Sequence, residues 1–242
     1  MCFLRKILRF LPICTALSLA VTVLPLESIT VGAAESYVTQ CEEMLKIINQ
    51  KRAEAGVEKL QLYIPACSAA KIRAKELVTE FSHSRPDGKG FDSVLSACNI
   101  STNKAAENIA YCSVSWTSAD AMEAWMNSPS HRDNILSPNY KYFGVGVVEG
   151  KYWEQLFIGD INKKKLSVGD VNGDGAIDAI DASAVLEFYA YSSVSDSFMH
   201  TNEFKDAADV DGTGAVDAMD ASKILKYYAD KAVGKPASLP RQ

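Results

Sequence analysis

The apolar positions of this chain fall into blocks with helical spacing, separated by polar turns. Over residues 38–56 they recur three and four positions apart, which predicts an amphipathic helix that ends at a glycine. A second helix is expected over about residues 65–81, with a proline suited to its first turn. A third begins at the expected cap Ser118 and carries Trp125 on its apolar face, so we expect this indole to pack in the core.

Two later segments have the composition of strands. Residues 142–148 and 151–158 are rich in aromatic and β-branched residues, and a turn at Glu149 and Gly150 joins them. Helices that cover a small antiparallel sheet predict an α+β domain built as an α-β-α sandwich.

The first 34 residues have the features of a secretory signal peptide. Basic residues precede an apolar run over 11–26, and Gly32, Ala33 and Ala34 form a small-residue cleavage site. The run is short for a membrane span, and no later segment is apolar enough to cross a bilayer. We therefore expect an exported chain that is released without a membrane span.

Acidity is concentrated in the C-terminal third. Residues 35–165 contain 16 acidic and 16 basic residues, whereas residues 166–234 contain 13 acidic residues and four lysines. No basic patch suggests nucleic acid as a partner, and bound cations would neutralise the acidic excess.

The cysteines that follow the predicted cleavage site allow three disulfide pairings in an exported protein. They are Cys41, Cys67, Cys98 and Cys112. Cys98 with Cys112 is the favoured pair, because the loop between them is short and both lie outside the long helices. The alternative is that all of them stay reduced and pack as small apolar residues.

The C-terminal third repeats itself, since the sequence of residues 170–190 returns 39 residues later at 209–229. Each copy begins with the D-x-[DN] pattern of a twelve-residue calcium loop and has glycine at the sixth place, where the chain must turn sharply. Side-chain oxygens at places one, three, five, nine and twelve, with a backbone carbonyl at place seven, predict two bound Ca²⁺ ions. The first set is Asp170, Asn172, Asp174, Ala176, Asp178 and Asp181; the second is Asp209, Asp211, Thr213, Ala215, Asp217 and Asp220.

Both loops end in Asp where an EF-hand usually has Glu, and each is followed by A-S-x-[VI]-L-x-[FY]-Y-A. This arrangement resembles the type I dockerin module over residues 167–234, a small all-α calcium-binding domain that attaches proteins to cohesin modules of a cellulosomal scaffold. The resemblance implies cohesin contacts at loop places ten and eleven, which are Ala179, Ile180, Ala218 and Met219. The alternative is that Ile180 and Met219 pack in the small core of the dockerin itself. His200, between the repeats, is expected on the surface.

Four motifs characterise the N-terminal domain: FSHSRPDGKGF at 81–91, AENIAY at 106–111, WMNSPSHRDNILSPNYKYFGVGV at 125–147 and YWEQLF at 152–157. They resemble the CAP superfamily of cysteine-rich secretory, antigen 5 and pathogenesis-related proteins, also called SCP domains. We assign residues 35–160 to this domain, 161–166 to a linker and 235–242 to a C-terminal tail.

The resemblance implies a cleft lined by two His and two Glu. His83, Glu107 and His131 match three of these positions, but Ser128 replaces the second Glu and Ala106 replaces a Gly of the motif. Two imidazoles and a carboxylate have the ligands of a zinc site with an open position. The same groups can instead transfer protons as catalytic residues, or hydrogen-bond only to hold loops together.

These observations predict a secreted, cellulosome-associated protein whose dockerin binds a scaffold cohesin in a calcium-dependent way and displays the CAP domain. The missing carboxylate at 128 favours a cleft that binds a peptide, lipid or glycan ligand, in the context of polysaccharide degradation, over an enzyme. The alternative is a hydrolase, most naturally a peptidase, although no HExxH, G-x-S-x-G or phosphate-binding loop occurs in the sequence.

Overall fold

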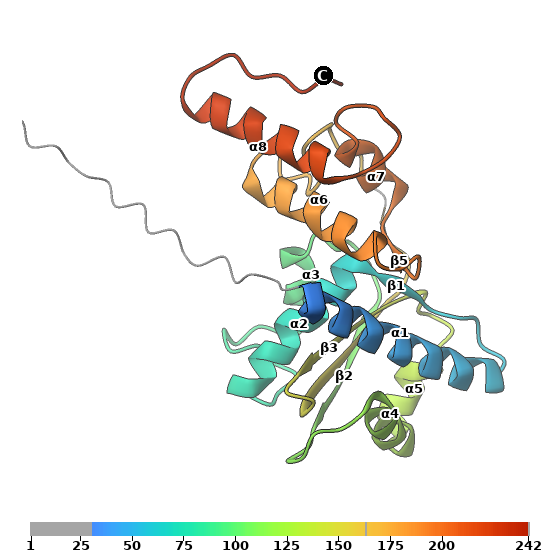
Figure 1. The fold of residues 1–242 in the computed structure, drawn as a ribbon. Coiled ribbons are helices and arrows are strands. Elements are labelled where there is room, and N and C mark those ends of the chain that lie inside the picture. The colour runs from blue at the N-terminus through green and yellow to red at the C-terminus, as the bar shows by residue number, and fades with distance from the viewer. Residues whose placement is uncertain (1–30, 163, 242) are drawn as a thin grey trace, which may run out of the picture.

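The computed structural model describes residues 31–162 and 164–241, which form an N-terminal α+β domain and a C-terminal helical module (Figure 1). Most of the predicted signal peptide, including Cys2 and Cys14, lies outside the described residues. Within the described ranges, no helix combines the length and the apolarity needed to cross a membrane.

Five strands form one mixed sheet: β1 (Gln61–Tyr63), β2 (Ala105–Tyr111), β3 (Tyr142–Val148), β4 (Tyr152–Ile158) and β5 (Phe198–Met199), in the order β2-β4-β3-β1-β5. β4 pairs antiparallel with both β2 and β3, and the predicted hairpin of β3 and β4 is therefore confirmed. β1 pairs parallel with β3 and with β5, so the expectation of a purely antiparallel sheet was wrong.

Helices cover both faces of the sheet, which confirms the predicted α-β-α layers (Figure 1). One face carries α1 (Val31–Glu54), α4 (Ser118–Asn127) and α5 (Pro129–Ile135); the other carries α2 (Ile64–Thr79) and α3 (Ser93–Ala97). Each face has its own core. The first contains Met44, Trp125, Phe143 and Phe157, and the second contains Ala69, Leu95, Leu156 and Ile158.

Glycines in β3 let α2 lie directly on the sheet. A Cβ at Gly144 would meet the backbone of Ala66 at 2.2 Å, and one at Gly146 would meet that of Ala70 at 2.1 Å. Any side chain at these places would push α2 away. The close contact fixes α2, which supplies Arg73 to the site described below.

Helix α4 starts one residue earlier than expected from its cap. The Thr117 hydroxyl accepts the amide of Asp120 at 3.2 Å and forms a capping box with it, so the predicted cap Ser118 is the first helical residue instead. Trp125 is 1% exposed, which confirms its predicted place in the core.

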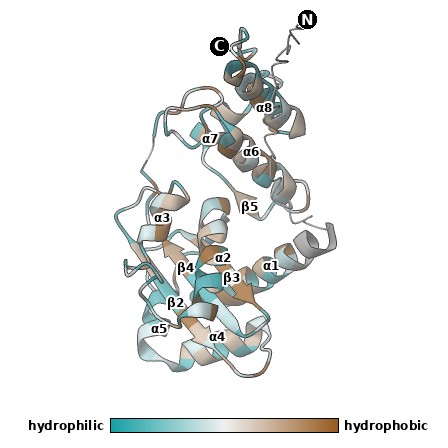
Figure 2. Cartoon of the chain, turned by 90° about the vertical axis from the view of Figure 1, so that its left-hand side faces the viewer, coloured by the Kyte–Doolittle hydropathy of each residue, from teal (hydrophilic) through white to brown (hydrophobic). Residues whose placement is uncertain are grey.

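The C-terminal module contains α6 (Ala179–Ser192), α7 (Asn202–Ala208) and α8 (Ala218–Ala232), with α6 packed on α8. Figure 2 shows these helices beyond the edge of the sheet where β5 lies. Because β5 belongs to the segment between the two repeats, the module is helical but also contributes a short strand to the other domain.

His200 and two residues of the predicted C-terminal tail take part in packing. The His200 ring lies 3.6 Å from that of Phe204, measured between centroids, so the surface assignment was wrong. In the predicted C-terminal tail, Leu239 is buried, and Arg241 donates to the backbone carbonyls of Asp206 and Asp209 at 2.7 and 2.6 Å.

All the cysteines after the predicted cleavage site are free thiols, so the favoured Cys98–Cys112 pair is not formed. Cys41 and Cys67 are fully buried and interact with each other between α1 and α2. Burial raises the pKa of the Cys41 thiol well above its ordinary value, and the neighbouring Cys67 raises it further. The alternative of reduced cysteines packed in the core therefore holds for Cys41 and Cys67, whereas Cys98 and Cys112 are reduced but only partly buried.

Candidate functional site

The predicted cleft is built around a buried carboxylate on the edge strand β2. Glu107 accepts two hydrogen bonds from Arg73 of α2, with Nε–Oε2 at 3.1 Å and Nη2–Oε1 at 3.2 Å. His83 Nδ1 lies 2.8 Å from Glu107 Oε1, although most of the imidazole is exposed. The structure thus brings together two of the three residues matched from the sequence, and it adds Arg73.

Arg73 also organises the loop that carries His83. Its Nη1 contacts Glu76 at 2.8 Å, and its Nη2 donates to the carbonyl of Ser82 at 2.8 Å. Arg85 holds Glu76 from the other side at 2.6 Å. These charge-assisted hydrogen bonds position the His83 loop from inside the domain.

The second histidine belongs to α5, on the other side of β2. The His131 carbonyl accepts the Asn108 side chain at 3.0 Å, and Asn134 donates to the same Asn108 at 2.9 Å. Burial lowers the pKa of His131, and the charge of His83 lowers it further.

The cleft residues do not fit a zinc ion well. Both oxygens of Glu107 already accept hydrogen bonds from Arg73, and a cation bound to them would face the guanidinium charge directly. In the described part of the chain, His83, Glu107 and His131 are not among the groups whose ligand atoms converge within 4.8 Å. We therefore assign no role to zinc.

A second buried carboxyl, missed in the sequence, lies beside Glu107. Glu154 of β4 faces Ile109 across the strand pair, which makes it the diagonal neighbour of Glu107 on the same face. It is fully buried, and neither oxygen has a hydrogen-bond partner among the described residues. Burial raises the pKa of Glu154 well above its ordinary value, and the charge of Glu107 raises it further while Arg73 lowers it. Only the period of two along β4 hinted that this side chain points inward.

Glutamine at position 154 should stabilise the N-terminal domain increasingly as the pH rises. The pKa of Glu154 is raised in the folded protein. Its contribution to the free energy of unfolding is therefore complete at a pH below the ordinary pKa of a Glu carboxyl, and it is lost as the pH rises through the raised pKa. Glu154→Gln stays neutral throughout. We expect its Tm to exceed that of the parent by about 2–8 °C at pH 8, with little difference at pH 5. Thermal unfolding monitored by tryptophan fluorescence in saturating calcium measures both values.

Glu123→Gln, at an exposed position of α4, is the matched control and should show no such trend. A Tm difference for Glu154→Gln that is the same at both pH values would contradict a protonated Glu154.

The first calcium loop has an open carboxylate. Asp170 Oδ1 is buried without a hydrogen-bond partner, while its Oδ2 accepts the amide of Gly175 at 3.0 Å. Gly175 has φ +92°, which a residue with a side chain rarely adopts. Asp181 is buried at the start of α6 and accepts the amides of Val171 and Asp178, both at 2.9 Å. A buried carboxylate oxygen that lacks a partner is the kind of ligand that a hard cation such as Ca²⁺ prefers.

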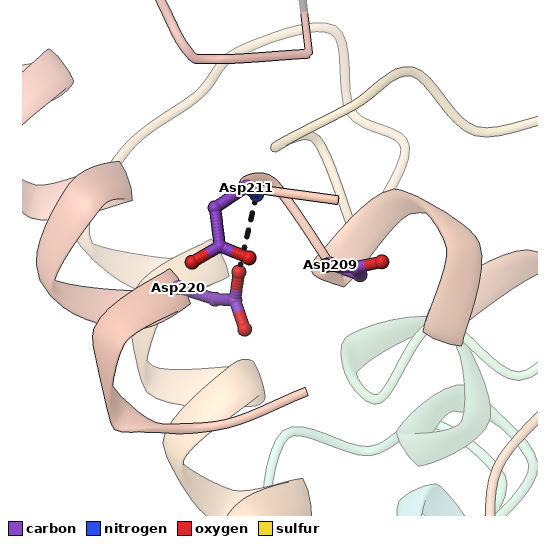
Figure 3. A group of neighbouring side chains, drawn as sticks. All are labelled: Asp209, Asp211 and Asp220. Carbon is purple, nitrogen blue, oxygen red and sulfur yellow. Dashed lines mark hydrogen bonds between the residues drawn. The ribbon is translucent and has the colours of Figure 1, made fainter. Parts of the chain in front are cut away.

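The second loop draws its carboxylates together. Ligand atoms of Asp209, Asp211 and Asp220 lie within 4.8 Å of one another, the one such group of His, Cys, Asp and Glu in the described residues. Figure 3 shows Asp220 beside Asp211, whose backbone amide donates to it at 3.4 Å. Gly214 repeats the positive φ of Gly175, at +85°. The two loops thus make the same positive-φ turn at their sixth place.

Residues at loop places ten and eleven start the helices α6 and α8. Ile180 is 61% exposed and Met219 is 57% exposed, so the alternative that they pack in the module's own core is wrong. Further exposed apolar residues occur at equivalent places of both repeats and were not predicted. They are Leu186 with Leu225 and Tyr189 with Tyr228. We call these residues, with Ile180 and Met219, the repeat surface.

Two families match this chain in separate segments. Residues 45–160 match the cysteine-rich secretory protein family, CAP, and residues 168–228 match the dockerin type I domain.

Two curated relatives match about half of this chain. YkwD, an uncharacterised protein of Bacillus subtilis, is 34% identical over 134 residues, which are 54% of this chain and 51% of YkwD. YlbC, an uncharacterised membrane protein of the same organism, is 31% identical over 122 residues, which are 50% of this chain and 34% of YlbC. The chain therefore spans about half or less of these relatives.

Among solved structures, an extracellular SCP-domain protein from Bacillus anthracis is similar to half of this chain. It is 25% identical, with a TM-score of 0.47, and the match covers 50% of this chain and 41% of that protein.

Proposed function

The chain carries a CAP domain followed by a type I dockerin domain, and we propose that it is an exported protein attached to a cellulosomal scaffold through calcium-dependent cohesin binding. The observation that carries this proposal is the duplicated loop, in which a buried Asp170 oxygen lacks a partner and three carboxylates of the second copy converge. Dockerin attachment then serves to display the CAP domain, in the context of polysaccharide degradation.

The proposed ligands are the residues of the two predicted sets. Bound calcium supplies positive charge that offsets 13 acidic residues in a module with four lysines. Asp181 and Asp220 act both as ligands and as the N3 members of the capping boxes of α6 and α8. Each loop therefore connects the cation to the start of a helix, and folding of the module follows from loading both loops.

The repeat surface is the proposed contact with cohesin. Its side chains are exposed in the described part of the chain and carry no charge, and the first turns and outer faces of α6 and α8 present them. Apolar and aromatic residues of this kind form the centres of protein interfaces. Because the two repeats present equivalent residues, either repeat can occupy the main contact, and two orientations of the cohesin complex are expected.

For the CAP domain we favour ligand binding in the cleft over catalysis. Glu107, the carboxylate that would act as a base, already contacts Arg73 and His83. Ser128, at the place of the family's second Glu, offers no carboxylate. Rings lie beside this site: Phe81 is 6.1 Å from Tyr111, and Tyr111 is 4.8 Å from Tyr152. Phe81 and Tyr111 are half exposed, so they offer flat faces to a peptide, lipid or glycan.

A hydrolase, most naturally a peptidase, is the second candidate. The His83–Glu107 contact of 2.8 Å is the observation that favours it, since a carboxylate can orient an imidazole for proton transfer. Screening the full chain against casein-type peptide libraries and plant polysaccharides, with product formation and binding both measured, separates turnover from binding.

Replacing His83 with alanine should weaken ligand binding at least tenfold with little change in stability. The imidazole is 62% exposed, so its loss should move the Tm by no more than about 2 °C. Lys89→Ala, in the same loop, is the control and should bind as the parent does. Fluorescence titration with the best ligand of the screen measures the effect, and unchanged affinity would exclude His83 from the binding site.

A further inference from the structure

The segment between the two dockerin repeats is bound to the edge of the CAP sheet. Phe198 and Met199 pair in parallel with Leu62 and Tyr63, so β5 covers the open edge of β1 (Figure 1). The Phe198 side chain is buried and stacks on Tyr191 of α6 at 4.9 Å. An edge strand that is covered in this way loses its exposed backbone donors and acceptors.

Polar contacts flank the strand on both sides. Glu42 of α1 accepts the hydroxyls of Ser195 and Ser197, the latter at 2.9 Å. On α2, Ser68 donates to Glu187 at 2.7 Å, and Lys71 donates to the Tyr191 hydroxyl at 2.7 Å. Lys71 and Glu187 form a half-exposed ion pair at 3.7 Å. Such a pair helps to orient the two surfaces but contributes little to the stability of the contact.

Aromatic packing completes the junction. His200 lies between Phe204 of the dockerin and Tyr63 of the CAP domain, with ring centroids 3.6 and 5.4 Å away. The apolar core of the first sheet face continues into the dockerin, where it includes Phe188, Tyr191 and Phe198. The two domains therefore share one core instead of being joined only by a linker.

The two repeats differ where the first one meets the CAP domain. Calcium ligands and the exposed Leu and Tyr residues recur in both copies. Glu187 and Tyr191, however, are replaced at the equivalent places of the second repeat by Lys226 and Asp230, which pair with each other. The second repeat thus lacks the residues that contact α2, and only the first is equipped for this contact.

We propose that the CAP domain docks its own dockerin, with the β1 edge, Glu42, Ser68 and Lys71 binding the first repeat and the inter-repeat strand. The docked pair is one rigid unit, so the cleft is held in a fixed direction relative to the bound scaffold. Docking also makes the CAP domain sensitive to calcium binding. Strand β5 lies between α6 and α7 in the chain, and the two calcium loops order these helices. This link rests on the proposed calcium binding, whereas the docking does not.

The test replaces two residues of the first repeat with the residues at the equivalent places of the second repeat. Because helix α8 already carries these residues, the replacements are compatible with a dockerin helix. In the full chain with calcium, Glu187→Lys with Tyr191→Asp should speed hydrogen exchange of the Leu62 amide, on the β5 side of β1, at least tenfold and increase the radius of gyration. The reverse exchange, Lys226→Glu with Asp230→Tyr, is the matched control and should leave both measurements unchanged. Protection of the Leu62 amide that equals the parent's in a variant with normal helical circular dichroism would overturn the docking.

A CAP-side variant keeps the test valid if the dockerin variant does not fold. Glu42→Ala with Ser68→Ala and Lys71→Ala removes the polar contacts without touching the dockerin, and it should give the same loss of protection. Adding a chelator to the parent should also speed exchange of the Leu62 amide. If the chelator changes neither the dockerin's circular dichroism nor this exchange, the calcium proposal fails, whereas unchanged exchange in both variants overturns docking itself.

Discussion

Replacing Asp170 and Asp209 together with alanine will leave the dockerin unfolded even in saturating calcium. Each residue holds the first place of its loop and accepts the amide of the turn glycine, Gly175 at 3.0 Å and Gly214 at 3.1 Å. Their loss removes a ligand and the support of the turn at once, and binding free energy in such sites is also folding free energy. Far-ultraviolet circular dichroism should show the loss of α6 and α8, and the parent in a chelator should give the same spectrum.

The control for this double variant is Asp196→Ala, which removes an exposed acidic residue from the same module without touching either loop. It should fold in calcium as the parent does. Tryptophan fluorescence reports on the CAP core separately, since Trp125 and Trp153 are buried there. A double variant with the parent's helical signal in calcium would show that the loops do not organise the module.

The repeat surface should tolerate one acidic substitution but not two. Ile180→Asp alone and Met219→Asp alone each leave the other repeat free to make the main contact, so each should weaken cohesin binding only slightly. Together they should cost at least about 2–4 kcal/mol, the scale of a buried hot spot. Isothermal titration with a purified cohesin, in calcium, measures all three variants against the parent.

The control is Val114→Asp, which changes an exposed apolar residue of the CAP domain. It should bind cohesin as the parent does. A single variant as damaging as the pair would mean that only one orientation is used. Full binding by the pair would place the cohesin contact elsewhere.

Periodic and repeated features of this fold were predictable from the sequence. The calcium loops follow from ligand spacing and from glycines that need positive φ, and the hairpin of β3 and β4 follows from alternation around a turn. His83 and Glu107 were found from the family motifs, and they lie 2.8 Å apart. The helices expected in the module after the Asp-terminated loops are observed as α6 and α8.

Features that depend on long-range contacts were not predictable. Strand β5 has two residues and no pattern of its own, and it forms only because β1, 136 residues earlier at Leu62, offers an edge. Glu154 and Arg73 have ordinary sequence contexts, and their burial depends on the register of β4 and on the approach of α2 to Gly144. The cysteine pairing was wrong because a short loop in sequence does not bring two side chains together.

The central claim, that a calcium-loaded dockerin attaches the CAP domain to a scaffold, is tested most directly by titrating the full chain with a type I cohesin module. We expect saturable one-to-one binding in calcium, no detectable binding in a chelator, and full recovery when calcium is restored. Equal affinity in calcium and in the chelator would contradict the account, and so would the absence of binding to any type I cohesin in calcium.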